Sequence, residues 1–233
     1  IGQDLYSKDF QSDTQLLFHC LENEDFDSIG NESGFYSFLF IDRSKRKFFG
    51  ARDHFGKKPM YFFCDSDLLI VASEDSAVRA VAEQYGKNVL IDNVAIKHYF
   101  EYKDLHFGKT FLTGIRELAP GSTLEFDFDN WNLTEGTSWS EYYLSTPFYK
   151  KQNKGSQVNG NSESSFSVLK ASLFSAVEKR FLADVPVQIA LSGGVDSTLL
   201  ALIANFKNKI FSRALTVSSN SRPSELKKSE FLC

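Results

Sequence analysis

Seven consecutive residues, Leu191 to Ser197 (LSGGVDS), combine the residue types that proteins use to hold a phosphate group. Gly193 and Gly194 have no Cβ, so their backbone amides can approach an anion closely. The two serine hydroxyl groups of this run can donate hydrogen bonds to phosphate oxygens. Asp196 is an unusual neighbour for a phosphate unless a cation lies between them, so it implies Mg²⁺ at this loop.

The residues around this loop predict a strand before it and a helix after it. Val185 to Leu191 is an apolar run apart from Gln188, which is typical of a buried strand in a parallel sheet. A helix is predicted from Ser197 or Thr198 to Phe206, with its positive end pointing at the loop. A second strand over Arg213 to Val217 completes one unit of an open α/β sheet. The glycine spacing is neither GxxxxGK[ST] nor GxGxxG, and an accidental Gly- and Ser-rich turn is the alternative.

The part of the chain before residue 135 shows a different pattern, with short aromatic and β-branched runs separated by charged or Gly-containing turns. This spacing predicts an α+β domain built on antiparallel hairpins. The predicted strands are Phe35–Asp42, Lys47–Arg52, Met60–Cys64, Leu68–Ser73, Ser122–Phe128 and Trp131–Thr134. The predicted helices are Thr14–Asn23, Asp75–Tyr85 and Asp92–Tyr102.

Two polar positions in this first part have ordinary structural interpretations. Ser12 and Asp13 precede the first helix, where either side chain can cap it. Arg52 and Asp53 stand between a strand and a turn, and we interpret them as a structural ion pair or a cap. Between the two parts, residues 151–164 are polar and rich in Lys, Asn, Gly and Ser, which predicts a linker between domains at 1–150 and 165–233.

Composition excludes several classes of protein. The net charge is −4 with both signs interspersed, so neither a nucleic acid nor an anionic membrane is an expected partner. No apolar run approaches the roughly 18 residues that a membrane span needs. The three cysteines, Cys20, Cys64 and Cys233, are far apart and odd in number, which argues against disulfides and a zinc site and favours a reducing compartment, the cytoplasm. The first residue is Ile1, and we expect the natural start to lie upstream.

The residues from Phe181 to Ser197 resemble the DVPxxxxLSGGxDSS stretch of glutamine-dependent asparagine synthetases, whose glycine loop is shared with other ATP pyrophosphatases. Gly50 to Tyr61 (GARDHFGKKPMY) resembles the ARDxFGxKPLYY segment of class II glutamine amidotransferases, the domain that precedes the synthetase domain in this family. Residues 12–15, Gly34–Asp42 and Phe111–Leu124 resemble further segments of that domain, in the same order. The resemblance therefore implies an Ntn-hydrolase-like amidotransferase domain followed by an α/β ATP-pyrophosphatase-like domain, both incomplete.

This resemblance also implies roles for particular residues. Asp13 would accept the α-amino group of glutamine, and Leu191 and Val217 would flank the adenine of ATP. The implied ATP site consists of Leu191, Ser192, Gly193, Gly194, Val195, Asp196, Ser197 and Val217, with Asp196 on Mg²⁺. The family's nucleophile is an N-terminal cysteine. None of the three cysteines matches it, and Cys20 and Cys64 are expected to be buried and inert.

The activity implied is asparagine synthesis: ammonia released from glutamine attacks aspartate that ATP has activated as an acyl-adenylate. The expected partners are glutamine, aspartate and ATP, and a second copy of the chain in a homodimer. Three alternatives stay open. The protein is a related amidotransferase acting on another carboxylate, a catalytically inactive homologue that works by interaction, or a nucleotide-binding module without catalysis.

Overall fold

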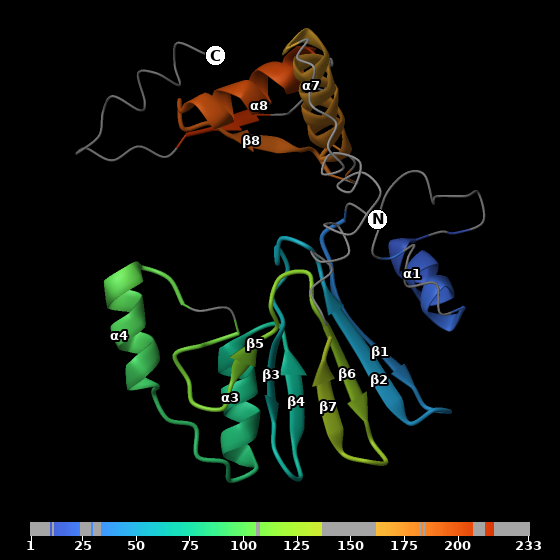
Figure 1. The fold of residues 1–233 in the computed structure, drawn as a ribbon, viewed down its shortest axis with the longest axis vertical. Coiled ribbons are helices and arrows are strands. Elements are labelled where there is room, and N and C mark those ends of the chain that lie inside the picture. Colours follow the sequence, from blue (N-terminus) through green and yellow to red (C-terminus); the bar gives the residue numbers. More distant parts are fainter. Residues whose placement is uncertain are drawn as a thin grey trace. The chain divides into compact units, whose positions relative to one another are not determined.

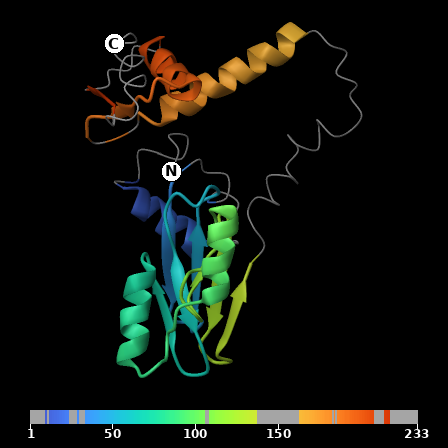
Figure 2. The same cartoon turned by 90° about the vertical axis from the view of Figure 1, so that its left-hand side faces the viewer.

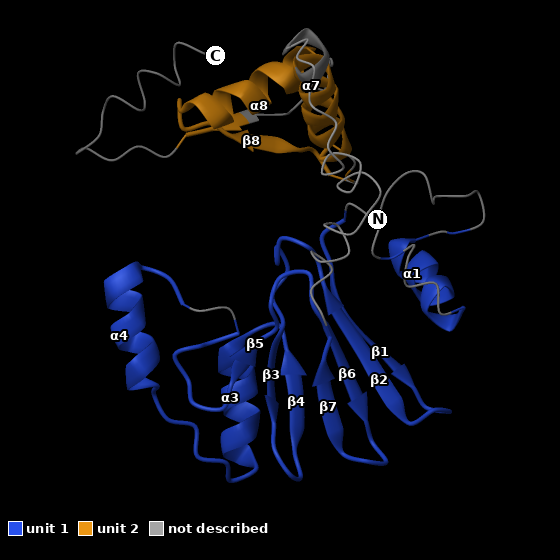
Figure 3. Ribbon diagram, viewed as in Figure 1, with its two compact units in different colours: residues 1–155 blue, residues 156–233 orange. Residues whose placement is uncertain are grey.

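The computed structural model of the chain describes residues 10, 12–23, 29, 34–105, 108–136, 162–181, 183, 185–206 and 213–216. The chain divides into two units, Ile1–Gly155 and Ser156–Cys233, which are coloured separately in Figure 3. No helix in the described segments is both long enough and apolar enough to cross a membrane.

The first unit contains two antiparallel sheets, as its hairpin pattern predicted. One has four strands in the order β1-β2-β6-β7, and the other has three in the order β4-β3-β5. The strands are β1 (Ser37–Asp42), β2 (Lys47–Arg52), β3 (Tyr61–Cys64), β4 (Leu69–Ala72), β5 (Arg116–Glu117), β6 (Thr123–Asp127) and β7 (Asn132–Glu135).

An aspartate stabilises the turn of each of the hairpins β1–β2, β3–β4 and β6–β7. Asp42 accepts hydrogen bonds from the backbone amides two and three residues later, at 2.9 and 3.0 Å. Asp65 and Asp127 do the same at the other two turns, with N···O distances between 2.9 and 3.2 Å. A short side chain that bonds to its own backbone in this way stabilises a tight turn. The register of the paired strands is therefore set locally, at each turn.

Alternate residues of the strands define four layers in the first unit. Phe48 and Phe126, from the four-stranded sheet, share a buried cluster with Phe62 of the other sheet. The opposite face of the four-stranded sheet packs against α1 (Asp13–Glu22), and the opposite face of the three-stranded sheet packs against α3 (Asp75–Gln84). The order is therefore α1, sheet, sheet, α3, which can be followed in Figure 1.

A third helix and one sheet edge in this unit expose apolar side chains. The helix α4 (Asn93–Tyr102) lies on the same side of the sheets as α3 in Figure 2, and Ala95 is its buried residue. On the edge strand β1, Leu39 and Ile41 are 45% and 61% exposed. Their partners on β2, Gly50 and Phe48, are buried. The core between the two sheets therefore covers β2 and does not extend over β1.

The described residues of the second unit form a two-stranded parallel sheet and two helices. β8 (Gln188–Ala190) pairs with β9 (Arg213–Leu215), and Val177 on α7 (Ser162–Lys179) packs with Ile203 on α8 (Val195–Phe206). The parallel pairing confirms the predicted βαβ unit. The prediction of a long, buried strand over Val185–Leu191 is wrong among the described residues: three residues form the strand, and Gln188 and Ala190 are exposed.

An ion-pair cluster joins the end of α3 to the turn between β3 and β4. The ammonium group of Lys87 lies 2.9 Å from Asp65 Oδ2 and also contacts Asp67. The hydrogen bond from Lys87 is the largest cause that lowers the pKa of Asp65 from 3.8 to about 2. A carboxyl group whose pKa falls on folding stabilises the fold above its unfolded pKa, and this contribution is lost as the pH falls through the folded value.

We therefore expect Lys87→Met to lower the Tm of the protein near neutral pH, with a difference from wild type that shrinks between about pH 4 and pH 2. The measurement is thermal unfolding by circular dichroism across that range. Lys45→Met is the matched control, because its ammonium lies 3.7 Å from Asp42, whose pKa is lowered first by the Ser44 hydroxyl. A Tm difference for Lys87→Met that is as large at pH 2 as at pH 6 would contradict this interpretation.

Candidate functional site

The loop between β8 and α8 forms the candidate anion site. The backbone amide of Leu191 donates to the carbonyl of Leu215 at 2.8 Å, so the loop begins directly after the last rung of the parallel ladder. The amide of Thr198 donates to the carbonyl of Gly194 at 3.0 Å, which makes Gly194 the N-cap residue of α8. The helix therefore starts at Val195, and the predicted start at Ser197 or Thr198 is wrong by two to three residues.

Two serine side chains connect the ends of this loop. The Ser197 hydroxyl accepts from the Ser192 amide at 3.3 Å and donates to the Gly194 carbonyl at 3.2 Å. The two serine hydroxyls lie 3.1 Å apart, and the Gly194 amide donates to Ser192 Oγ at 3.4 Å. The structure thus brings Ser192, Gly194 and Ser197 together. Several of these distances are long for hydrogen bonds, so an anion could replace these partners at small cost.

The two glycines of the loop play different structural roles. Gly193 has φ of 73°, in the left-handed region where a residue with a Cβ is strained. Gly194 does not have a positive φ, so within this pair the backbone needs glycine at position 193. A Cβ built on Gly194 would meet only Ser192 Oγ, at 3.4 Å. The protein itself therefore leaves space at Gly194, where the helix begins.

Asp196 lies in the first turn of α8 and is exposed. The amides of this turn have no acceptor within the helix, and the helix dipole adds positive potential there. Among the described residues there is no group of three His, Cys, Asp or Glu side chains placed to hold a metal ion. A single carboxylate suits Mg²⁺ that takes its remaining ligands from substrate phosphates and water. Val195 is exposed, and Val217 lies outside the described residues.

In the first unit, the Arg52–Asp53 pair holds the turn that follows β2. Arg52 is 5% exposed and donates to the carbonyls of Lys58 and Gly56, each at 2.8 Å, and to that of Leu118. It also pairs with Glu117 at 2.8 Å. Asp53 is fully buried and accepts from three backbone amides, those of Phe55, Lys57 and Lys58. Their predicted structural role is confirmed, although the partners are backbone groups and Glu117.

Asp13, the proposed glutamine contact, is the first residue of α1. The cap of this helix is Ser12, whose hydroxyl accepts from the Gln15 amide at 3.2 Å. Asp13 accepts from the amide of Thr14 at 2.8 Å and is exposed. Of the two predicted cap residues, Ser12 caps the helix and Asp13 does not, and the role of Asp13 toward glutamine stays a prediction.

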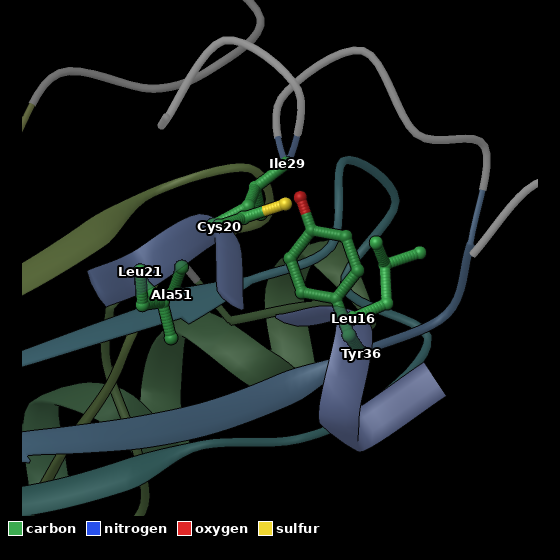
Figure 4. Close-up of a cluster of buried hydrophobic side chains, with 6 residues drawn as sticks. All are labelled: Leu16, Cys20, Leu21, Ile29, Tyr36 and Ala51. Carbon is green, nitrogen blue, oxygen red and sulfur yellow. The ribbon is translucent and has the colours of Figure 1, made fainter. Parts of the chain in front are cut away.

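The two described cysteines differ in burial. Cys20, on the buried side of α1, lies among Leu16, Ile29 and Tyr36, as Figure 4 shows. Cys64 is partly buried at the end of β3, and burial, followed by the nearby charge of Asp65, raises the pKa of its thiol. A raised pKa reduces the thiolate fraction and hence the reactivity. Burial is confirmed for Cys20 and is partial for Cys64, and Cys233 lies outside the described residues.

A groove of about 890 Å³ lies on the outer face of the four-stranded sheet beside α1. Phe40 and Phe49 line its apolar part, and Lys47, Glu125 and Asp127 line its polar part. Lys47 and Asp127 lie 3.7 Å apart, so part of this charge is paired internally. Neither Asp13 nor the loop at 191–197 lines this groove, so none of the predicted site residues belongs to it.

Two family models match the chain in the order of its two units. Residues 4–140 match the model described as "Glutamine amidotransferase domain", and residues 168–231 match the model described as "Asparagine synthase". The class of protein is therefore an amidotransferase domain followed by an asparagine synthase domain. The antiparallel sheets of the first unit and the parallel strands of the second are consistent with this division.

Several curated proteins are similar to this chain over most of its length. A Methanocaldococcus jannaschii protein, provisionally named asparagine synthetase (glutamine-hydrolyzing) 2, is 28% identical over 84% of this chain and 36% of its own length. Asparagine synthetase (glutamine-hydrolyzing) 1 of Bacillus subtilis is 25% identical over 85% of this chain and 29% of its own length. Amidase chyE of Penicillium rubens is 25% identical over 97% of this chain and 32% of its own length. The chain belongs to the glutamine-hydrolysing asparagine synthetase family and spans about a third of the length of the curated relatives it matches.

Proposed function

We propose that the loop at 192–197 binds the phosphates of ATP, in an enzyme that uses ammonia from glutamine to amidate the β-carboxylate of aspartate. The observation that carries this proposal is the position of the loop, which leaves the carboxyl end of β8 and opens α8 with Gly194 as its N-cap. Ligands of open α/β sheets bind at that edge, and anions bind at the amides of a helix N-terminus.

Each residue of the loop has a part in this proposal. The first amides of α8 and the hydroxyls of Ser192 and Ser197 would hold phosphate oxygens, and Gly193 would allow the backbone to turn around them. Asp196 would hold Mg²⁺, which, when bound, neutralises the pyrophosphate that leaves as aspartate becomes an acyl-adenylate. Leu191 and Val217 remain the proposed apolar contacts of the adenine.

In the first unit, Asp13 is the proposed partner of the α-ammonium group of glutamine. A carboxylate is the natural partner of an ammonium group, and this one is exposed at the start of α1. The buried Arg52–Asp53 cluster would keep the turn after β2 rigid. The nucleophile of the glutaminase reaction is not assigned to any residue of the chain.

A second candidate is an amidotransferase of the same build whose acceptor is another carboxylate. The specific observation in its favour is the similarity to a relative named as an amidase rather than as an asparagine synthetase, which covers 97% of this chain. The ATP loop would serve both reactions. Aspartate-dependent pyrophosphate release by the intact enzyme separates the two candidates, because the second would not be stimulated by aspartate.

The proposal predicts that the 233-residue chain binds Mg·ATP and that Gly194→Asn weakens this binding about tenfold or more. Asparagine is a favourable N-cap, so helix α8 should keep its stability while the new amide group occupies the first-turn amides that the phosphates need. Calorimetric titration measures the affinity, and thermal unfolding checks the fold. Equal Mg·ATP affinities in the two proteins, or no binding by wild type, would remove the support for an ATP site at this loop.

A further inference from the structure

Leu191, the residue before the loop at 192–197, is held at the end of β9 through both its backbone amide and its backbone carbonyl. The amide of Leu191 donates to the Leu215 carbonyl at 2.8 Å, and the carbonyl of Leu191 accepts from the hydroxyl of Thr216 at 2.5 Å. The side chain of Leu191 is 3% exposed, and Thr216 is half-buried. Both backbone polar groups and the side chain of Leu191 are therefore fixed before the chain enters the loop.

The loop that follows has much weaker internal restraints. Its hydrogen bonds between Ser192, Gly194 and Ser197 are 3.1 to 3.4 Å long, against 2.5 Å for the bond from Thr216. Bonds near 3.4 Å are at the weak end of the range for proteins. The position of Ser192 relative to the first turn of α8 thus depends on how firmly the Leu191 carbonyl is held.

We propose that Thr216 is a positioning residue for the phosphate loop: its hydroxyl holds the Leu191 carbonyl so that Ser192 and the amides of the loop are arranged for an anion before it arrives. This inference rests on the proposed function of the loop. Thr216 itself does not need to touch the ligand. Its β-branched side chain has few χ1 rotamers, so its hydroxyl stays aimed at the Leu191 carbonyl with little loss of entropy. Preorganised donors bind an anion more tightly than donors that must first be ordered.

The test compares Thr216→Val, which keeps the shape and loses the donor, with Thr216→Ser, which keeps the donor. The first measurement is amide hydrogen exchange by NMR on the 233-residue chain without nucleotide, where we expect Thr216→Val to speed exchange at Leu191, Ser192 and Gly194 about fivefold to tenfold. Thr216→Ser should exchange at nearly the wild-type rate. Ile203→Val, in the buried cluster of this unit, is the control: it should lower the Tm without changing the exchange of the loop.

The second measurement is calorimetric titration with Mg·ATP, with inorganic pyrophosphate plus Mg²⁺, and with adenosine. Thr216→Val should weaken both phosphate ligands by the same factor, about fivefold to tenfold, because the loop amides depend on the Leu191 carbonyl being held. Adenosine should stay within about twofold, because its proposed contact is the apolar side chain of Leu191, which stays packed when the hydroxyl is lost. Thr216→Ser should restore wild-type binding. A purely structural role would weaken all three ligands together.

The two measurements test the positioning role of Thr216 and the ATP site separately. Unchanged loop exchange in Thr216→Val, or equal behaviour of the valine and serine variants, would overturn the positioning role. A wild-type chain that binds neither Mg·ATP nor pyrophosphate would overturn the proposed function and with it any role of Thr216 in nucleotide binding. In that case the exchange rates alone still decide whether the Thr216 hydroxyl holds the loop.

Discussion

Replacing Asp196 with asparagine is expected to remove most of the Mg²⁺ dependence of ATP binding, while metal-free ATP binds at least as tightly as it does to the wild type. The reason is the sign of the charges at the start of α8. Asp196 is exposed in the first turn, beside the amides that would hold the phosphates. Without a cation, its carboxylate repels a polyphosphate, and with Mg²⁺ bound between them the same carboxylate becomes a ligand of the bridging ion.

The measurement is a set of calorimetric titrations of the 233-residue chain with ATP, in excess Mg²⁺ and in excess EDTA. We expect the wild type to bind ATP about tenfold or more tightly in Mg²⁺ than in EDTA, and Asp196→Asn to show a ratio near one. Glu101→Gln, which removes an exposed carboxylate from α4 in the other unit, is the control and should behave as wild type. If Asp196→Asn kept the full Mg²⁺ effect, the ion would have to be held elsewhere, and Asp196 would lose its proposed role.

The elements of the first unit could be predicted closely from the sequence because their signals are local. The strand Lys47–Arg52 was predicted with the bounds that the structure shows, since a charged turn precedes it and a β-branched and aromatic pattern marks its neighbours. Asp42, Asp65 and Asp127 bond to amides within three residues of themselves, so each hairpin turn is encoded where it occurs. Local signals of this kind can be recognised in a single sequence.

The second unit was harder to predict because the burial of its strand depends on the elements packed beside it. The run Val185–Leu191 is apolar enough for a buried strand, yet burial is decided by the elements around it, and β9 is the one strand described beside β8. The sequence predicts too late a start for α8 because valine, aspartate and serine are poor helix formers in the middle of a helix, although they are acceptable in its first turn. The sequence predicts the loop between strand and helix correctly, but it does not predict the residue at which the helix begins.

Two long-range side-chain contacts carried no usable sequence signal. Arg52 reaches a carbonyl 66 positions away, at Leu118, and Thr216 reaches one 25 positions away, at Leu191. A threonine that follows a short strand is common, and so is a glutamate near an arginine. Neither residue type therefore predicts which distant group it contacts. Long-range hydrogen bonds of this kind become visible only when the strands are placed side by side. The contacts of Thr216 with the start of the loop and of Arg52 with the turn after β2 therefore could not be predicted from the sequence.

The turn after β2 provides the second large expected effect, because Gly56 has no room for a side chain. Its φ is +60°, and a Cβ there would lie 2.9 Å from the guanidinium group of Arg52 and from Cγ of Pro120. Arg52 cannot move away easily, since it is 5% exposed and holds Glu117 and three backbone carbonyls. A methyl group at this position must therefore strain the backbone and displace a buried charge from its partners.

We expect Gly56→Ala to lower the free energy of unfolding by about 3 to 5 kcal/mol, the cost typical of breaking a buried charge network. Urea unfolding followed by circular dichroism measures this. Gly86→Ala is the matched control: its φ is +75° and a Cβ there meets nothing within 4 Å, so it carries only the backbone strain of about 1 to 2 kcal/mol. Similar losses for the two variants would mean that the left-handed backbone alone sets the cost. The contact between Gly56 and Arg52, and with it the rigidity proposed for this turn, would then have no energetic support.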